Sequence, residues 1–183
     1  YDARNSMVSL EDAKGNITQY GYDNKGNLSL MTDSLGRTKK YSYSVVNMLE
    51  LVKDANGKNS RYIYDSNGNI KSVINPLGGR TEYTYDKSDR LISESTPSDG
   101  IIEYKYNAAS LVEEMKNARG DIINYTYDEA GRIVSISTEN DTTQYTYDAN
   151  GNILKVTDSQ GTITREYDAN NRIKKYIDIN GNE

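Results

Sequence analysis

Recurring acidic residues are the first candidates for chemistry in this sequence, because paired carboxylates carry general acid–base catalysis and glycoside hydrolysis. Asp33, Asp54 and Asp158 represent one position that recurs in most of the chain, shortly before a glycine. Asp at such a place is typical of a hairpin turn, where its side chain hydrogen-bonds nearby backbone. No trio of nucleophile, base and orienting group interrupts the pattern. We therefore predict no catalytic residue and no enzyme activity.

Two Asn- and Asp-rich stretches, 148–152 and 178–182, have some of the oxygen-rich composition of a calcium loop. They lack the acidic ligand pattern and the distal Glu of an EF-hand loop. Plain turns are the favoured interpretation, and structural calcium at one or two turns is the alternative. Because the chain has no Cys, it has no disulfide framework and no thiolate metal site. We predict no metal site and no cofactor.

Tyrosine is the other residue type that could bind a ligand, since the 17 tyrosines are the only aromatic residues in the chain. An exposed row of rings could stack on sugar faces or hold an unfolded client. A row of rings stacked across neighbouring strands would instead stabilise the fold, by about 0.2–1 kcal/mol for each cross-strand pair. The stacked row is the favoured interpretation, and burial of the rings separates the two.

The tyrosines recur at a fixed interval, which sets the organisation of the chain. One tyrosine, in most units followed by Asp, opens each repeat at intervals of 21 and finally 20 residues: Tyr1, Tyr22, Tyr43, Tyr64, Tyr85, Tyr106, Tyr127, Tyr147 and Tyr167. A second tyrosine precedes most of these by two residues, except where Arg165 replaces it: Tyr20, Tyr41, Tyr62, Tyr83, Tyr104, Tyr125 and Tyr145. We predict that these tyrosines define the repeat together with the turn glycines, which are Gly15, Gly26, Gly36, Gly57, Gly68, Gly78, Gly120, Gly131, Gly151 and Gly161.

Each repeat holds two turns and two short strands. The consensus YDxxGN(I/L)xxVxDxxGxxTxY places Asp at the start of both turns and Gly, which tolerates positive φ, near their ends. Strand alternation puts Tyr83 and Tyr85 on one face and Glu82 and Thr84 on the other. The facing strand begins at an aliphatic residue, and a second apolar position follows three residues later, where Glu94 breaks the column. The shortened repeats lose their residue at the second turn.

We therefore predict an all-β fold of tandem antiparallel β-hairpins, with two strands in each 20–21-residue repeat and no helix. Almost nine repeats give about 17 strands, which would extend about 80 Å at about 4.8 Å per strand. Because strand twist accumulates over such a width, the sheet should curl, spiral or close. The most helix-compatible segment, 108–118, is in register with strands of the other repeats.

Composition excludes several classes of partner. The net charge of −5, the pI near 4.9 and the dispersed Lys and Arg residues argue against nucleic acid and against an anionic membrane. No apolar run is long enough to cross a membrane. Because only 35% of residues are hydrophobic and tyrosine supplies all aromatic burial, the core should be shallow and partly hydrated.

The repeats run through residues 1–183 without a linker, so we expect one continuous array. No atypical capping repeat occurs at either end, although solenoid-like arrays usually need such caps. We therefore expect a piece of a longer polypeptide, or a protomer whose ends are covered by neighbours.

The segments YDSNGNIKSVINPLGGRTEYTYD and YDANGNILKVTDSQGTITREYD resemble YD repeats of the Rhs (rearrangement hotspot) family. Relatives in that family include bacterial wall-associated proteins, shell-forming subunits of Tc toxins and animal teneurins. The resemblance covers essentially the whole chain. It implies a sheet of hairpins that spirals into a hollow shell, which in bacterial members encloses a C-terminal toxin. The self-cleaving region with DPxG-type motifs has no counterpart, since no Asp precedes Pro.

The resemblance implies a non-catalytic scaffold of an exported bacterial protein, secreted or at the cell surface. Its partner would be the rest of its own longer chain or an encapsulated toxin cargo. A carbohydrate-binding adhesin that binds cell-surface glycans is the second hypothesis. The third is a protomer of an extracellular fibre, self-associating through open sheet edges. We expect neither nucleic-acid binding nor membrane insertion.

Overall fold

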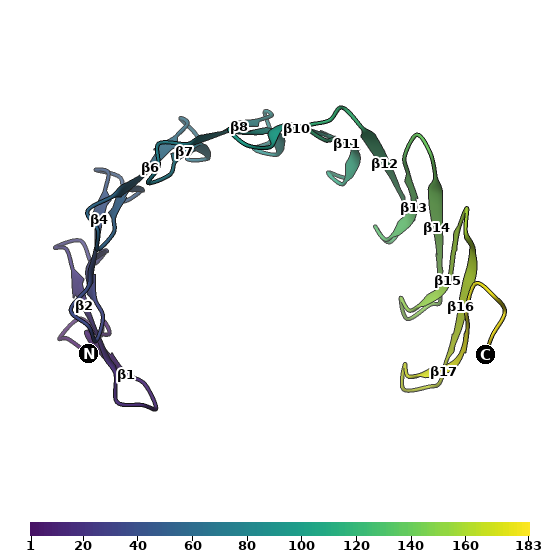
Figure 1. The fold of residues 1–183 in the computed structure, drawn as a ribbon, viewed down its shortest axis with the longest axis horizontal. Coiled ribbons are helices and arrows are strands. Elements are labelled where there is room, and N and C mark those ends of the chain that lie inside the picture. Colours follow the sequence, from purple (N-terminus) through teal and green to yellow (C-terminus); the bar gives the residue numbers. More distant parts are fainter. The chain divides into compact units, whose positions relative to one another are not determined.

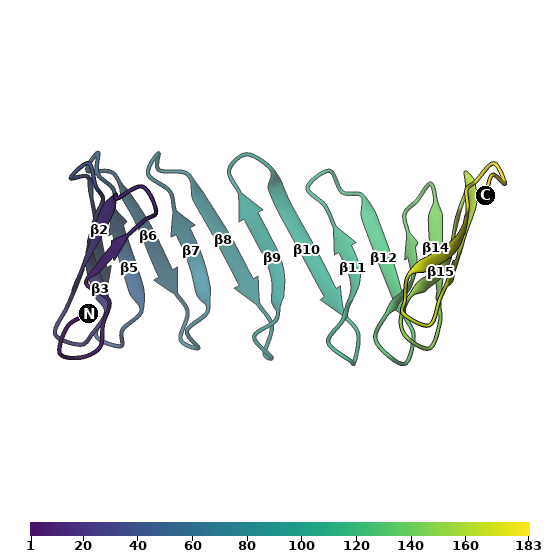
Figure 2. The ribbon, with the colours of Figure 1, turned by 90° about the horizontal axis from the view of Figure 1, so that it is seen from below.

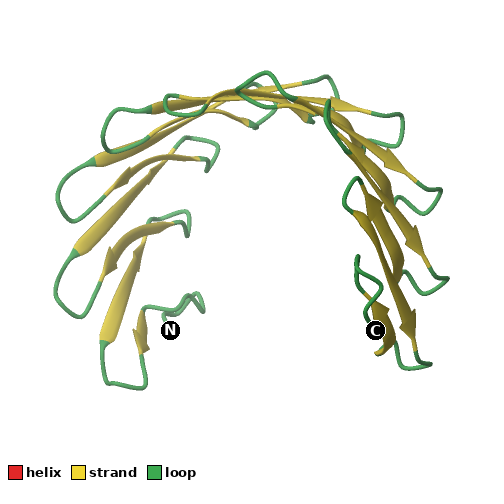
Figure 3. Ribbon diagram, turned by 45° about the vertical axis from the view of Figure 1, so that its right-hand side comes forward, coloured by secondary structure: helices red, strands yellow, loops and turns green.

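A computed structural model describes residues 1–183 and contains 17 strands, all antiparallel, and no helix (Figure 3). This confirms the expected all-β fold of tandem hairpins. The chain forms two compact units, Tyr1–Ser98 and Asp99–Glu183. None of its elements is a helix long and apolar enough to span a membrane.

Within each unit the strands pair in chain order, so that each strand lies beside its sequence neighbours (Figures 1 and 2). The first unit contains β1 (Ser9–Glu11), β2 (Ile17–Tyr22), β3 (Leu28–Thr32), β4 (Thr38–Tyr43), β5 (Leu49–Lys53), β6 (Asn59–Tyr64), β7 (Ile70–Ile74), β8 (Arg80–Tyr85) and β9 (Leu91–Thr96). The second contains β10 (Gly100–Tyr106), β11 (Val112–Lys116), β12 (Ile122–Tyr127), β13 (Ile133–Ser137), β14 (Thr142–Tyr147), β15 (Ile153–Asp158), β16 (Gly161–Tyr167) and β17 (Ile173–Ile177).

Most of these elements start or end where the sequence predicted. The helix-compatible segment 108–118 forms a turn followed by β11. The first repeat is an exception: its facing strand was expected to begin at the aliphatic residue Met7, but β1 begins at Ser9 and pairs with β2 over only three residues.

Most turns are built around the carboxylate of their first residue, which is Asp. In one example, the Asp65 amide donates to the Asn69 carbonyl at 2.9 Å, and the Gly68 amide donates to the Asp65 carbonyl at 3.3 Å. The Asp65 carboxylate accepts the amides of Asn67 and Asn69, both at 2.9 Å. The turn that begins at Asp54 repeats this pattern on the other rim of the sheet. One side chain thus satisfies two amides that have no partner in the strands.

The fourth residue of such a turn takes a left-handed backbone conformation, which explains the recurring glycine. Each of the ten glycines named above has positive φ, for example +89° at Gly151. Where glycine is missing, Asn, Asp or Ser adopts the same conformation, as at Asn47 with φ of 64°. Asn and Asp are the residues that best tolerate it.

The shortened repeats differ from the others at the second turn. The Thr138 amide donates to the Asp141 carbonyl at 2.8 Å, one residue closer than in the longer turns. Asp158 pairs directly with Gly161, which leaves two residues in that turn. This confirms that both deletions fall in turns, where they leave strand pairing intact.

A β-bulge explains the three-residue spacing of the apolar positions. Ile63 pairs with Ser72 and Tyr64 pairs with Ile70, so Lys71 is an extra residue in β7. The same shift occurs directly before the corresponding tyrosine in other repeats. As a result, Ile70 and the apolar residue three positions later lie on the same face of the sheet.

Each unit is a single layer, in which strands contact only their sequence neighbours. No apolar side chain is fully buried, in line with the shallow core expected from composition. Ser72 is the one fully buried residue, and its hydroxyl has no hydrogen-bond partner, for which we find no physical account. The alternating exposure of β8 and β12 shows that one face is half-buried and the other exposed.

We predict that Gly151→Ala lowers the free energy of unfolding by about 1 kcal/mol, because a side chain disfavours positive φ. No atom lies within 4 Å of the added methyl group, so the effect would come from the backbone alone. Asn5→Gly is the matched control, because Asn5 has φ of 62° and its side chain makes no hydrogen bond, and the change should be neutral or slightly stabilising. Urea denaturation followed by circular dichroism measures both, and equal destabilisation by the two changes would contradict this account.

Candidate functional site: the tyrosine face

The repeat tyrosines and the aliphatic residues opposite them share one face of the sheet, here called the tyrosine face. Tyr62 pairs with Val73, and Tyr64 pairs with Ile70. The other hairpins follow this register, in pairs such as Tyr41 with Val52. Tyrosine strands therefore alternate with aliphatic strands. The expected stacking of rings across neighbouring strands is wrong, because hairpin pairing puts an apolar side chain directly opposite most rings and Glu94 opposite Tyr83.

The tyrosine that opens each repeat is here called the YD tyrosine, and seven of these tyrosines link their hairpin to the preceding one. In each of the seven, the hydroxyl donates to the carbonyl of the residue that starts the aliphatic strand of the previous repeat. The bonds are Tyr22 to Met7 at 2.8 Å, Tyr43 to Leu28 at 3.0 Å, Tyr64 to Leu49 at 2.8 Å, Tyr85 to Ile70 at 2.9 Å, Tyr127 to Val112 at 2.7 Å, Tyr147 to Ile133 at 2.6 Å and Tyr167 to Ile153 at 3.0 Å. These phenols are structural donors, and the spacing of 21 or 20 residues fixes where each one reaches.

Burial raises the pKa of the phenols of Tyr43, Tyr64, Tyr85 and Tyr127 above the usual 10.0. A smaller effect in Tyr64 comes from Tyr62 and Glu50. Because the raised pKa favours the protonated donor in the folded state, its contribution to stability is complete at neutral pH. That contribution is lost as the pH rises through the folded-state pKa.

The second tyrosine of each repeat is bonded differently. The hydroxyls of Tyr20, Tyr41, Tyr62, Tyr83, Tyr125 and Tyr145 have no hydrogen-bond partner within the protein, although the side chains are half-buried. The ring is packed, but the polar tip is left for solvent or a ligand. The tyrosine face therefore carries phenols that are bonded to the backbone and, on the same strands, these six phenols whose hydroxyls are free.

Two positions depart from this pattern. Arg165 replaces a second tyrosine, and the residue paired with it is Tyr176 in place of an aliphatic residue. The Arg165 guanidinium lies 5.9 Å from the centre of the Tyr176 ring, within reach of a cation–π interaction. Glu94 pairs with Tyr83, and the pKa of Tyr83 is raised first by burial and then by this carboxylate.

The carboxylates considered for catalysis are bonded to turn backbone. Asp33 accepts the amides of Leu35 and Arg37 at 3.0 and 2.9 Å. Asp158 accepts the amides of Gln160 and Gly161 at 2.8 and 3.2 Å. Each of these carboxylates lies in a separate turn, and neither unit brings them together.

The two calcium-like stretches show the same bonding. Asp148 accepts the amides of Asn150 and Asn152, and its second oxygen accepts the Asn152 side-chain amide at 2.8 Å. That side-chain bond is the main cause that lowers the pKa of Asp148 below 3.8, and the same holds for Asp178 with Asn182. No group of three or more Asp, Glu, His or Cys residues is placed to hold a metal ion.

Sequence reasoning missed a set of bonds between neighbouring turns. The Asn69 side-chain amide donates to Asp89 of the next repeat at 2.7 Å, and Asn152 donates to Asn171 at 2.9 Å. The acceptors occupy the positive-φ position that glycine takes elsewhere. In the sequence, these bonds are marked only by Asn or Asp in place of the turn glycine. That replacement indicates a hydrogen bond only when it is known that the two turns lie side by side.

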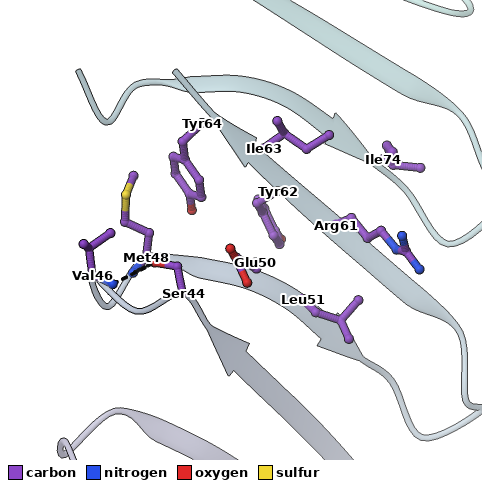
Figure 4. Close-up of a pocket in the computed structure, with 10 residues that line it drawn as sticks. All are labelled: Ser44, Val46, Met48, Glu50, Leu51, Arg61, Tyr62, Ile63, Tyr64 and Ile74. Carbon is purple, nitrogen blue, oxygen red and sulfur yellow. Dashed lines mark hydrogen bonds between the residues drawn. The ribbon is translucent and has the colours of Figure 1, made fainter. Parts of the chain in front are cut away.

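A hollow of about 550 Å³ lies beside β5, β6 and β7 (Figure 4). Figure 4 shows Tyr62 and Tyr64 on one side of β6, with Arg61 and Ile63 on the other. Its lining is mainly apolar and includes Ile74. The hollow has no convergent set of acid, base and nucleophile, so its chemistry is that of a contact surface.

Two family models match the chain. The model described as Teneurin YD-shell matches residues 102–181, and the model described as RHS Repeat matches residues 1–38 and 64–101. No curated protein sequence matches the chain at a significant level.

Solved structures share the fold. The crystal structure of a TcdB2–TccC3–Cdc42 complex is similar with a TM-score of 0.73 and 21% identity, over 86% of this chain and 10% of that chain. The Photorhabdus luminescens Tc holotoxin pore, as a TccC3 variant, gives a TM-score of 0.71 and 20% identity over the same shares. The present chain thus spans about a tenth of the length of these structures.

We predict that Tyr64→Phe lowers the free energy of unfolding by about 1 kcal/mol, because the Leu49 carbonyl loses its donor. Tyr62→Phe is the matched control on the same strand and should leave stability almost unchanged. Urea denaturation of both variants provides the measurement. A loss of similar size in both would show that the hydroxyl bond to the preceding repeat is not what stabilises the array.

Proposed function

Because the chain belongs to the YD-repeat (RHS) family, we propose that it is a non-catalytic wall element of an exported bacterial protein that encloses or displays a cargo. The observation that carries this proposal is the row of bonds from YD tyrosines to the preceding repeat. The hydroxyls of the YD tyrosines and the turn carboxylates are hydrogen-bonded to backbone, so these recurrent polar groups stabilise the sheet and its turns. A regular, single-layer wall is what such bonding produces.

The repeat-defining residues support a structural role. The YD tyrosines join successive hairpins, the turn glycines supply the left-handed conformation, and both act in the same way in most repeats. An active site would be expected to break the regularity at one place. We propose that the two units are successive parts of one repeat array that has no enzyme activity.

The family and the similar structures also support an exported location and a cargo. One of those structures is a Tc holotoxin pore. We propose that the protein is secreted or held at the cell surface, and that its partner is the rest of a longer chain or an enclosed toxin. Neither nucleic acid nor a membrane interior is a partner in this proposal.

Electron microscopy of the native, full-length particle tests this function. We expect a hollow particle with density inside it. An extended fibre built of repeating arcs would reject enclosure and favour the filament alternative, in which arrays associate through sheet edges. A solid particle without an interior would reject both.

Glycan binding is a second candidate function, favoured by the free hydroxyls of six of the second tyrosines, among them Tyr83. A phenol with a packed ring and an open polar tip offers both stacking and hydrogen bonding to a sugar. If glycans bind here, Tyr83→Ala should weaken binding several-fold, whereas Thr84→Ala on the opposite face should not. A glycan array followed by calorimetry measures this, and equal binding by both variants would remove the candidate.

A further inference from the structure

The face opposite the tyrosine face, here called the polar face, carries an unusual patch in the first unit. The patch spans β4 to β7 and combines three cations with three aliphatic side chains: Lys40, Lys53, Arg61, Leu51, Ile63 and Ile74. Strand register places them together, because Lys40 pairs with Lys53, Leu51 with Arg61, and Arg61 with Ile74. Ile63 follows Arg61 by two residues and therefore lies on the same face.

The three cations of the patch have no counter-charge. Lys40, Lys53 and Arg61 are exposed, and none of them has an ion-pair or hydrogen-bond partner. Lys40 and Lys53 are direct cross-strand partners, an arrangement that destabilises a sheet. The carboxylate on this face of β8, Glu82, is already bonded to Arg80 at 3.0 Å.

Three repeats further along the chain, the equivalent positions of the second unit hold residues of opposite charge. Glu103 occupies the position of Lys40 and pairs with Lys116, with 3.0 Å between the charged atoms. Glu114 occupies the position of Leu51 and bonds to Lys105 at 2.8 Å. The repeat thus accepts complementary charges at these positions. The first unit instead has like charges and an apolar residue, which the fold itself does not require.

The aliphatic side chains of the patch remain accessible. Ile63 is 40% exposed, and Leu51 and Ile74 are half-buried. Together with Arg61 they contribute to the lining of the hollow of about 550 Å³ (Figure 4). From the polar face, a side chain entering this hollow would meet Leu51, Ile63 and Ile74 beside the free guanidinium of Arg61. The rest of the lining includes Glu50, and Tyr62 and Tyr64 line it from the other side of β6. Cations flanking an apolar hollow are complementary to a chain segment that alternates carboxylates with apolar side chains.

We propose that this patch binds an extended acidic segment of a partner polypeptide, whose carboxylates pair with Lys40, Lys53 and Arg61 and whose apolar side chain enters the hollow. The binding of carboxylates removes the repulsion between Lys40 and Lys53, so the partner supplies the charge that Glu103 supplies in the second unit. This proposal goes beyond the scaffold function, since it does not depend on closure of a shell.

A fluorescein-labelled peptide of alternating Glu and Leu is a suitable probe, with fluorescence anisotropy as the readout on the full chain. We expect saturable binding that weakens with salt. Lys40→Glu should weaken it about tenfold, and the same change should raise the urea midpoint, because it recreates the charge pair of the second unit. A stabilised fold with lost binding is an outcome that a purely structural role for Lys40 would not give.

Lys155→Glu is the charge-matched control, since Lys155 is an exposed cation on the polar face of the second unit. Equal weakening by this control would overturn the proposal, because binding would then follow net charge. A peptide with Ser in place of Leu that binds as tightly, or equal binding of heparin or anionic vesicles, would also overturn it in favour of a general polyanion surface. Rejection of this binding proposal would not affect the scaffold function, which the microscopy experiment tests separately.

Discussion

The hydrogen bond from a YD tyrosine to the preceding repeat, made by seven of these tyrosines, is the interaction on which the rest of the structure depends. A single-layer sheet has no second layer to bury its apolar side chains, and no apolar residue here is fully buried. Stability must then come from contacts between adjacent hairpins. The phenol provides both parts of such a contact, because its ring covers aliphatic neighbours while its hydroxyl satisfies a carbonyl beside the bulge. A phenylalanine could supply only the first.

The turn carboxylates solve a related problem at the rims of the sheet. A tight turn leaves backbone amides without strand partners, and one Asp accepts two of them. Bonds such as Asn69 to Asp89 then join neighbouring turns. The rims are therefore ordered by short, local bonds that repeat along the chain. This repetition lets the array lengthen by whole hairpins without needing a new core.

Departures from the repeat are the most informative positions for function. At some of these positions the partner residue also changes: Arg165 replaces a tyrosine, Tyr176 replaces the aliphatic residue opposite it, and the two side chains still make a contact with a ring. The pair of Lys40 and Lys53 is not compensated within the protein. In a fold whose regular positions are committed to architecture, such uncompensated positions are where partner binding would be expected. Both faces of a single layer are open to it.

The sequence by itself determined the repeat length, the two turns, the alternation of strands and the absence of helices, because these depend on local backbone preference and on spacing. Tertiary structure alone decided which groups meet across repeats. The bond from Tyr64 to Leu49 and the opposition of Lys40 and Lys53 follow from hairpin register and from the bulge, which shifts the pairing by one residue. Sequence reasoning predicted ring-on-ring stacking because it fixed the face of each tyrosine. Only the pairing of strands showed that a strand with aliphatic side chains lies between successive tyrosine strands.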